Sequence, residues 1–265
     1  MITVKDIATK IEELAPLSLS ADFDNTGLLV GRYDKEVKKI LVTLDVDENV
    51  CYEAIREGAD LIISHHPVMF HATKRLTEST PMERYLRNLI SNDISLYSAH
   101  TNLDCAKGGI NDYMADMLGI EDTTVIEEVY SEKGISEGFG RCGILKDKKT
   151  LAEVIELYKN KFDVSVVRYV GDENRPIKKV AVNTGGGAFA LDSLIGTDVD
   201  LFISGDFKYN QFRDAYENNL CIIDAFHYDS EKISMNFFAD YIGRHFPDVD
   251  VIKSKENICV TKYSL

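Results

Sequence analysis

Apolar residues in the first hundred positions fall into short runs that alternate with amphipathic segments. The runs at 38–46 and 60–66 predict strands, because β-branched and other apolar residues follow one another without helical spacing. Apolar residues at helical spacing predict a helix over 48–58 and another near 81–92. A further strand is expected over 94–100. Strands that alternate with helices indicate βαβ units, so we predict a largely parallel sheet with crossover helices.

The same order of elements returns in the second half of the chain. Within the segment 178–207, Lys179 matches Lys39 and Asp200 matches Asp60, and the members of each pair are 140 positions apart. We therefore predict an α/β protein of two related lobes with largely parallel sheets. The alternative interpretation is a chance likeness between two βαβ units.

The repeat also suggests how the chain is divided. We expect a first lobe over residues 1–125 and a second over 126–231. An amphipathic helix and two short strands, at 248–254 and 256–263, follow the second lobe. Together these last residues, 232–265, could return to the first lobe.

Composition limits the classes of function. The 265 residues are 45% hydrophobic and 28% charged, as expected of a globular protein that can bury a core. The net charge of −14 argues against a broad surface for nucleic acid, because phosphate binding requires clustered Lys and Arg. A small or locally bound partner is therefore expected, although an acidic balance is also explained by solubility alone.

Cysteine usage and hydropathy indicate a cytoplasmic protein. The five cysteines are scattered and contain no C-x-x-C pair, so neither a disulfide framework nor a cysteine zinc site is expected. Charged residues interrupt the N-terminal segment where a signal peptide would need an apolar stretch. No apolar run approaches the roughly 18 residues of a membrane span, so no membrane partner is expected.

Candidate metal ligands follow the predicted strands. His65 and His66 come directly after a buried run, and Pro67 restricts His66 to extended geometry. Two imidazoles at the carboxyl end of a strand can reach two different ions. The alternative is that one histidine caps the strand and the other packs in the core.

Two further pairs of polar residues also follow strands. His227 and Glu231 stand four positions apart, as do His100 and Asp104, and residues four apart share one face of a helix. A histidine and a carboxylate at this spacing suit one or two metal ions. Two carboxylates with two divalent ions would leave a net positive site that can hold an anionic substrate.

Other motifs have both a structural and a functional interpretation. The glycine-rich loop 183–188 could hold phosphate through backbone N–H groups, or it could be a tight turn. Arg141 could grip a phosphate or pair with a carboxylate across the lobes. Lys74 and Lys208 are basic residues close to the motifs, whereas His71 has no ligand-like neighbours.

Seven strings in order along the chain resemble the NIF-like family, whose members carry the name GTP cyclohydrolase 1 type 2 homologue. They are DNTGLLVG (24–31), ISHHPVMF (63–70), SAHTNLD (98–104), GFGRCG (138–143), NTGGGA (183–188), SGDFKYN (204–210) and HYDSE (227–231). The resemblance implies two α/β lobes with a dinuclear metal centre between them, and a homohexamer built as a trimer of dimers.

The resemblance also implies roles for individual residues. The metal ligands would be His65, His66, Asp104, His227 and Glu231, with Glu231 as the bridge between the ions. His100 would lie near the ions without binding them. Two positions depart from the family pattern, since Phe226 stands where many relatives have Gly and Asn210 stands where a histidine is expected.

Three functions of different classes are compatible with these residues. The first is a hydrolase that uses two divalent ions, Fe, Mn or Zn, to act on a nucleotide or a phosphorylated heterocycle, with His100 or Asp206 relaying protons. The second is an iron or metal chaperone or cofactor-assembly protein, for which the ions are cargo. The third is a ring-shaped interaction scaffold. Neither the native metal nor the substrate follows from the sequence.

Overall fold

The computed structural model describes residues 1–132 and 134–262, which form two compact units. Unit 1 comprises Met1–Leu103 and Ser234–Leu265, and unit 2 comprises Asp104–Ile233. The C-terminal segment thus belongs to the same unit as the N-terminal hundred residues. The boundary expected from the sequence, after residue 125, falls further along the chain, inside a long strand of unit 2.

Unit 1 is built on a five-stranded sheet that is parallel in its centre. The strand order is β1-β4-β3-β2-β11, in which β2, β3, β4 and β11 run parallel and β1 is antiparallel to β4. The strands are β1 (Gly27–Val30), β2 (Lys39–Thr43), β3 (Leu61–Ser64), β4 (Ser95–Ser98) and β11 (Asp250–Lys253). The predicted parallel sheet and the strand within 248–254 are confirmed.

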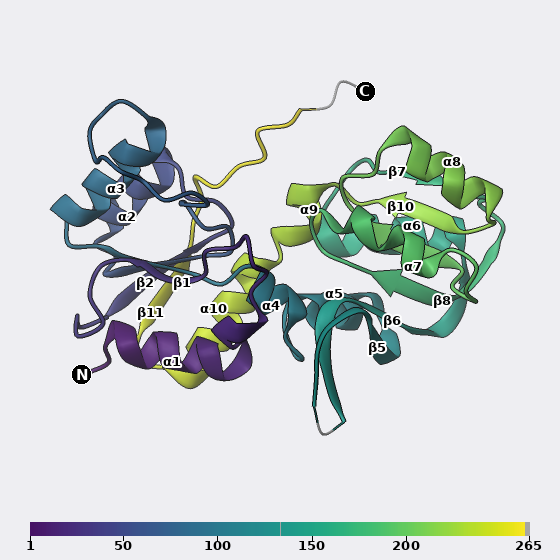
Figure 1. Ribbon diagram of the computed structural model, residues 1–265, viewed down its shortest axis with the longest axis horizontal. Coiled ribbons are helices and arrows are strands. Elements are labelled where there is room, and N and C mark those ends of the chain that lie inside the picture. Colours follow the sequence, from purple (N-terminus) through teal and green to yellow (C-terminus); the bar gives the residue numbers. More distant parts are fainter. Residues whose placement is uncertain (133, 263–265) are drawn as a thin grey trace. The chain divides into compact units, whose positions relative to one another are not determined.

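Helices cover both faces of this sheet. Helices α2 and α3 lie on one face, and α1 and α10 lie on the other (Figure 1). Their bounds are α1 (Val4–Leu14), α2 (Glu48–Glu57), α3 (Pro81–Ser91) and α10 (Ser234–His245), and a short 3-10 helix, η1 (Leu17–Leu19), follows α1. Side chains at helix N-termini accept backbone hydrogen bonds there, as Thr3 does for α1, Asp47 for α2 and Thr80 for α3.

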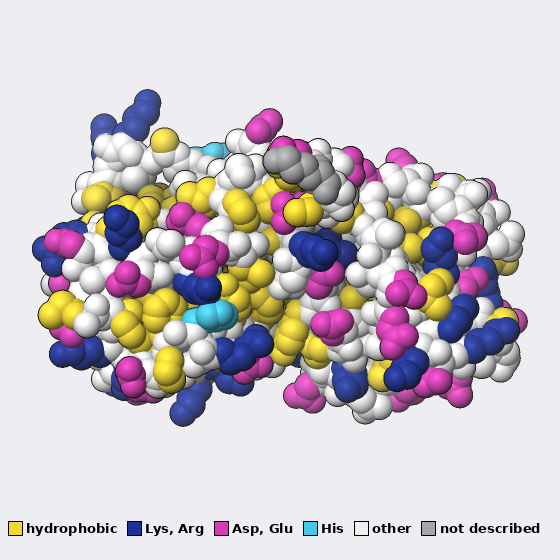
Figure 2. All heavy atoms as spheres, turned by 90° about the horizontal axis from the view of Figure 1, so that it is seen from below, with side chains coloured by type: hydrophobic (Ala, Val, Ile, Leu, Met, Phe, Trp, Pro, Cys, Tyr) yellow, Lys and Arg dark blue, Asp and Glu magenta, His cyan; other side chains and the backbone are white. Residues whose placement is uncertain are grey.

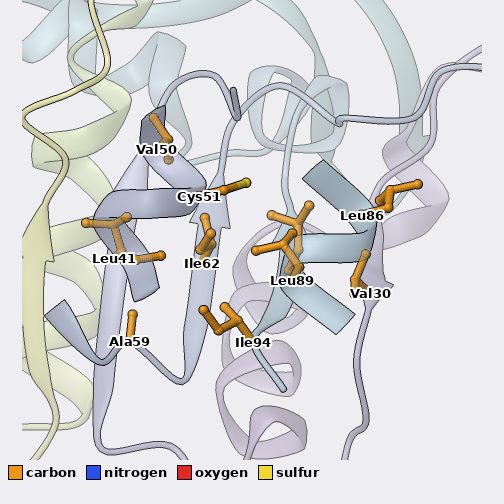
Figure 3. Close-up of a cluster of buried hydrophobic side chains, with 11 residues drawn as sticks. Val30, Leu41, Val50, Cys51, Ala59, Ile62, Leu86, Leu89 and Ile94 are labelled. Atoms are coloured by element: carbon orange, nitrogen blue, oxygen red, sulfur yellow. The ribbon is translucent and has the colours of Figure 1, made fainter. Parts of the chain in front are cut away.

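One row of apolar side chains joins the α2–α3 layer to the sheet. Leu41, Ile62 and Leu96 are register neighbours on adjacent strands and are fully buried. Figure 3 shows side chains of α2 and α3 gathered on the sheet around Ile62. Burial of one such side chain contributes about 1.5–3 kcal/mol, so this row is a main source of the stability of unit 1.

Unit 2 has a six-stranded sheet with a parallel centre and antiparallel edges. The order is β5-β6-β8-β9-β10-β7, in which only β8, β9 and β10 run parallel. The strands are β5 (Ile120–Glu132), β6 (Ile135–Thr150), β7 (Arg168–Val170), β8 (Pro176–Val182), β9 (Leu201–Ser204) and β10 (Cys221–Asp224).

Helices cover both faces of this second sheet as well. Helices α5 and α6 lie on one face and α7 and α8 on the other (Figure 1). The helices are α5 (Ile110–Leu118), α6 (Leu151–Phe162), η2 (Gly187–Ala190), α7 (Leu191–Leu194), α8 (Tyr209–Glu217) and α9 (His227–Glu231). Helix α4 (Thr101–Cys105) begins in unit 1 and ends in unit 2.

The two units repeat each other in detail. The buried row of unit 2 is Ala181, Phe202 and Ile222, at the same register positions as the row of unit 1. In unit 1, Oδ2 of Asp60 accepts from the backbone N–H groups of residues 38 and 39, at 2.8 and 3.1 Å. In unit 2, Oδ2 of Asp200 accepts from the backbone N–H groups of residues 178 and 179, at 2.9 and 3.0 Å. The prediction of two related α/β lobes is therefore confirmed.

Two parts of the chain differ from the sequence-based expectation. The long β5–β6 hairpin was not predicted, because exposed and polar residues dominate its outer part and conceal the period of a strand. The strand expected over 256–263 is wrong for residues 256–262, and Tyr263 lies outside the described residues. There Glu53 accepts from the backbone N–H groups of Lys255 and Glu256, so side chains replace strand pairing.

Within the part of the chain that the structure describes, no helix is both long and apolar enough to cross a membrane.

The repeated aspartates generate a stability prediction. Asp60→Ala and Asp200→Ala should each lower the free energy of unfolding by about 1–3 kcal/mol, because each leaves two backbone N–H groups without their carboxylate. Asp34→Ala is the matched control, since that side chain is 85% exposed. Urea denaturation of the three variants measures the difference. Equal stability of all three would show that the repeated hydrogen bonds contribute nothing.

Candidate metal centre

Three histidines of unit 1 cluster at the carboxyl ends of its parallel strands. His65 and His66 follow β3, and His100 follows β4. Their rings lie 5.2–5.4 Å apart, centroid to centroid, and one nitrogen of each lies within 4.8 Å of the others. Side chains at this edge of a parallel sheet are brought together because adjacent parallel strands end at the same place. The cluster could hold a metal ion.

Each of these histidines is oriented by a hydrogen bond at Nδ1. The acceptors are the backbone oxygen of Ala99 for His65, at 2.8 Å, and Oδ1 of Asp45 for His66, at 2.7 Å. Oδ2 of Asp24 plays the same part for His100, at 3.0 Å. These oxygens only accept, so Nδ1 must carry the proton and Nε2 carries the lone pair. This is the arrangement in which protein histidines bind metals, with the other nitrogen held by a carboxylate or carbonyl.

Asp24 remains ionised beside its histidine. Burial alone would raise the pKa of Asp24, but the hydrogen bonds from His100 and Thr101 lower this pKa well below its usual range. The folded-state pKa of Asp24 lies below that of the unfolded chain. Its hydrogen bonds therefore stabilise the protein at pH values above the ordinary carboxyl range, and this contribution is lost as the pH falls through the lowered pKa.

Unit 2 carries a histidine and two carboxylates, Glu231 and Asp206, at the equivalent edge of its own sheet, and a third carboxylate, Asp104, on α4. His227 and Glu231 stand on α9, which follows β10, and Nε2 of His227 lies 3.0 Å from Oε2 of Glu231. Nδ1 of His227 donates to Oδ2 of Asp206, at 2.8 Å, just beyond β9. An oxygen of Asp104 lies within 4.8 Å of an oxygen of Glu231, and both carboxylates are buried.

This arrangement of charges favours a cation. Two buried carboxylates so close together repel each other, and a divalent ion removes that repulsion. In the protein without metal, the hydrogen bond to Glu231 and, to a smaller extent, the one to Asp206 raise the pKa of His227 to about 9. A proton on Nε2 then occupies the direction in which a metal would bind. Oxygen and imidazole donors of this kind suit Zn, Mn and Fe.

The glycine-rich loop of unit 2 is shaped to accept Glu231. A Cβ added at Gly185 would lie 1.8 Å from Oε1 of Glu231, so only glycine leaves room for the carboxylate. The backbone N–H of Gly185 donates to Oγ of Ser230, and that of Thr184 donates to Oδ1 of Asn111, both at 2.9 Å. Because these two N–H groups already have acceptors, this part of the loop acts as a tight turn beside the site.

Phe226, one of the two departures from the family pattern, is strained. Its φ of 56° and ψ of 149° place it in a region that non-glycine residues rarely adopt and that costs about 1–3 kcal/mol. Its N–H donates to Oδ1 of Asp224, at 3.1 Å, and its ring lies 5.9 Å from the guanidinium carbon of Arg168. Arg168 also pairs with Asp224. These contacts hold the residue directly before His227 in place.

Three of the candidate residues thus belong to unit 1 and three to unit 2. His65, His66 and His100 lie together in unit 1, and Asp104, His227 and Glu231 lie together in unit 2. His100, expected near the ions without binding them, offers its nitrogen in the same cluster as the other two histidines of unit 1. The ligand assignments themselves remain predictions.

Two other candidates have structural roles. Asp206 accepts from Nδ1 of His227 and so orients that ring; its proton-relay role remains a prediction. Arg141 is buried within unit 2, where it pairs with Asp112 and donates to four backbone oxygens. Arg141 therefore pairs with a carboxylate, as its structural interpretation expected, and both residues belong to unit 2 because the boundary between the units falls before Asp104.

Three residues that the sequence left unnoticed support the histidines of unit 1. Asp24 and Asp45 hold His100 and His66. Oδ1 of Asn257 accepts from Oγ1 of Thr43 and from the backbone N–H groups of residues 44 and 45, at 2.7–3.1 Å, and so fixes the end of β2. Asp45 lies near the carboxyl end of the strand predicted over 38–46, so the rule that functional groups gather at strand ends could have found it. Asn257 lies more than two hundred residues from its partners, and no local pattern marks it.

Comparison with known proteins gives consistent matches over the whole chain. The model of the Duf34/NIF3 (NGG1p interacting factor 3) family matches residues 2–258. A protein from Clostridium perfringens named GTP cyclohydrolase 1 type 2 homolog is 39% identical over 256 residues, which cover 96% of each chain. A protein of the same name from Methanocaldococcus jannaschii is 32% identical and is matched over 94% of this chain and 97% of its own.

Solved structures are similar over the same length. Reduced HcgD from Methanocaldococcus jannaschii has a TM-score of 0.81 at 31% identity, covering 96% of this chain and 98% of that one. A Bacillus cereus protein related to NIF3 has a TM-score of 0.88 at 23% identity, with full coverage of both chains. At that identity the second structure supports the fold alone.

The contact between Gly185 and Glu231 can be tested with a matched pair of variants. Gly185→Ala and Gly196→Ala both place alanine at a positive φ, of 62° and 80°, which costs about 1–2 kcal/mol in each case. Only the first also meets a carboxylate, because nothing lies within 4 Å of a Cβ at Gly196. Gly185→Ala should therefore be the less stable variant and should bind less metal. If Gly185→Ala binds as much metal as Gly196→Ala, or more, the proposed fit of the loop to Glu231 is contradicted.

The protonation of His227 can be followed by NMR. In metal-free protein its imidazole should titrate near pH 9, and Glu231→Gln should lower this pKa because the strongest partner of the imidazolium is lost. The raised pKa stabilises the folded state below the unfolded value, and this stabilisation is lost as the pH rises through about 9. A wild-type midpoint near the ordinary histidine value would show that the pair with Glu231 does not form.

Proposed function

Because the chain belongs to the Duf34/NIF3 family, we propose that it is a metal-dependent hydrolase that binds two divalent ions and acts on a small phosphorylated substrate. The proposed ligands are His65 and His66 from unit 1, with Asp104, His227 and Glu231 from unit 2.

The observation that carries this proposal is the shared orientation of the histidines. Nδ1 of each of His65, His66 and His227 donates to a carbonyl or carboxylate oxygen. In all three the second nitrogen therefore points away from its anchoring partner and can act as a ligand. A histidine that merely packs or caps a strand does not need this orientation, so its repetition in both units supports metal binding.

The charge balance of a two-ion site suits an anionic substrate. Asp104 and Glu231 contribute two negative charges and neutral imidazoles contribute none, so two dications leave the site with a positive charge. An anionic substrate is then attracted to it. Glu231, between its histidine and a second carboxylate, is the proposed bridge.

The residues of the chain would prepare the site for hydrolysis. When bound, such a pair of ions polarises the scissile group and lowers the pKa of a coordinated water. His100 keeps its proton at Nδ1 against Asp24, so its Nε2 can accept a proton from an attacking water. Asp206 keeps His227 in the tautomer that offers Nε2.

The charge of the chain and the names of its relatives support the proposed substrate class. Relatives named GTP cyclohydrolase 1 type 2 homolog suggest a nucleotide or another phosphorylated heterocycle. The net charge of −14 does not favour nucleic acid. Acidic and basic side chains are interspersed on the face that Figure 2 shows, and no broad basic patch lies there.

We also propose that the protein assembles as a homohexamer. Light scattering measures its molar mass and so tests this assembly.

Two substitutions distinguish a bridging carboxylate from a terminal one. Glu231→Gln should deplete both metal ions, because a bridging charge offsets the repulsion between two dications. Asp104→Asn should deplete mainly one ion. Elemental analysis after reconstitution with Fe, Mn or Zn gives the counts, and Asp116→Asn, at an exposed position of α5, is the control.

A turnover screen of the same preparations tests the hydrolase. The wild-type protein with two ions should hydrolyse at least one nucleotide or phosphorylated heterocycle, and Glu231→Gln should lose that activity together with its metal. Wild-type protein that holds no metal would contradict the proposal. Protein that holds two ions, hydrolyses nothing and hands its ions to an acceptor would instead be a metal carrier.

A further inference from the structure

A pocket lies beside the histidines of unit 1, in the loop between His66 and α3. Its volume is about 520 Å³, which is within the range of small-molecule sites. Its lining includes Phe70, Lys74, Arg75 and Glu83. None of these residues belongs to the proposed metal centre, and all of them lie in one unit.

Phe70 connects the pocket with the histidine cluster. Its ring lies edge to face with that of His100, 5.8 Å from centroid to centroid, and the side chain is 46% exposed. The loop is held by Asn25, whose Nδ2 donates to the backbone oxygen of Met69 at 2.7 Å. A planar group bound against Phe70 would therefore lie close to His100.

The charges in the pocket favour an anion. The lining holds two cationic side chains, Lys74 and Arg75, and one carboxylate, that of Glu83. Glu83 already accepts from the hydroxyl and N–H of Thr77 and from the N–H of Ser79. Neither Lys74 nor Arg75 forms an ion pair with any residue in 1–132 or 134–262. The lining thus carries more positive than negative charge, which favours an anionic group.

We propose that this pocket is the substrate subsite, in which Lys74 and Arg75 bind the phosphate of a phosphorylated planar heterocycle and Phe70 contacts its ring. This proposal rests on the proposed hydrolase function, because it assigns the substrate of that metal centre. Lysine contributes a point charge, whereas arginine can bind two phosphate oxygens through its planar guanidinium. Phe70 would then direct the ring of the substrate towards the histidines.

The test uses calorimetry on metal-loaded protein at low salt, with GTP, guanosine and inorganic phosphate as probes. Lys74→Met combined with Arg75→Met should weaken GTP binding by about tenfold or more while guanosine binding changes little, since only the charge contacts are removed. Phe70→Leu should weaken GTP and guanosine alike. Lys148→Met, at an exposed position of unit 2, is the matched control and should change nothing.

Several outcomes separate this inference from the proposed function. If the double variant keeps its metal and binds GTP as the wild type does, the subsite assignment is wrong and the metal centre stands. If the wild type binds none of the three probes at millimolar concentration, the subsite assignment is also wrong. If the wild type binds GTP without holding any metal, and the double variant no longer binds GTP, the pocket binds phosphate and the hydrolase proposal fails.

Discussion

The site depends on one recurrent interaction, the hydrogen bond that holds Nδ1 of a histidine against an oxygen at the end of a parallel strand. A free imidazole can turn about two bonds and exchange its proton between two nitrogens. Ala99 and Asp45 remove both freedoms from His65 and His66, and Asp206 does so for His227. Because these oxygens only accept, each ring offers Nε2 in a fixed direction. The shared orientation makes metal binding a better account of these residues than packing or capping.

The repeated βαβ framework explains why such groups occur in both units. In each unit the parallel strands end at one edge, and each framework is held by an aspartate, Asp60 or Asp200, that accepts two backbone N–H groups. The residues directly after these strands differ between the two units. His66 and Asp206 are 140 positions apart, at equivalent places after β3 and β9. One is a proposed ligand, whereas the other orients a ligand. A single framework thus presents mainly nitrogen donors in unit 1 and mainly carboxylates in unit 2.

The sequence predicts much of this arrangement, because the strands are short, apolar and repeated. Its local patterns place His65 and His66 at a strand end and space His227 four residues from Glu231. They do not reveal Asp24 or Asn257, whose roles depend on contacts between distant parts of the chain. For the same reason the segment 256–262 resembles a strand in sequence, although Glu53, two hundred residues away, binds the backbone at its start. The resemblance in seven motifs suggested the metal ligands, and the hydrogen bonds at Nδ1 now give a physical reason for them.

Anomalous diffraction at the metal edge from crystals of the reconstituted protein tests the central claim most directly. The account predicts two peaks per chain, about 3.5–4 Å apart, with Nε2 of His65, His66 and His227 as nitrogen ligands and Glu231 contacting both ions. A single peak, or ions bound away from these nitrogens, would contradict it.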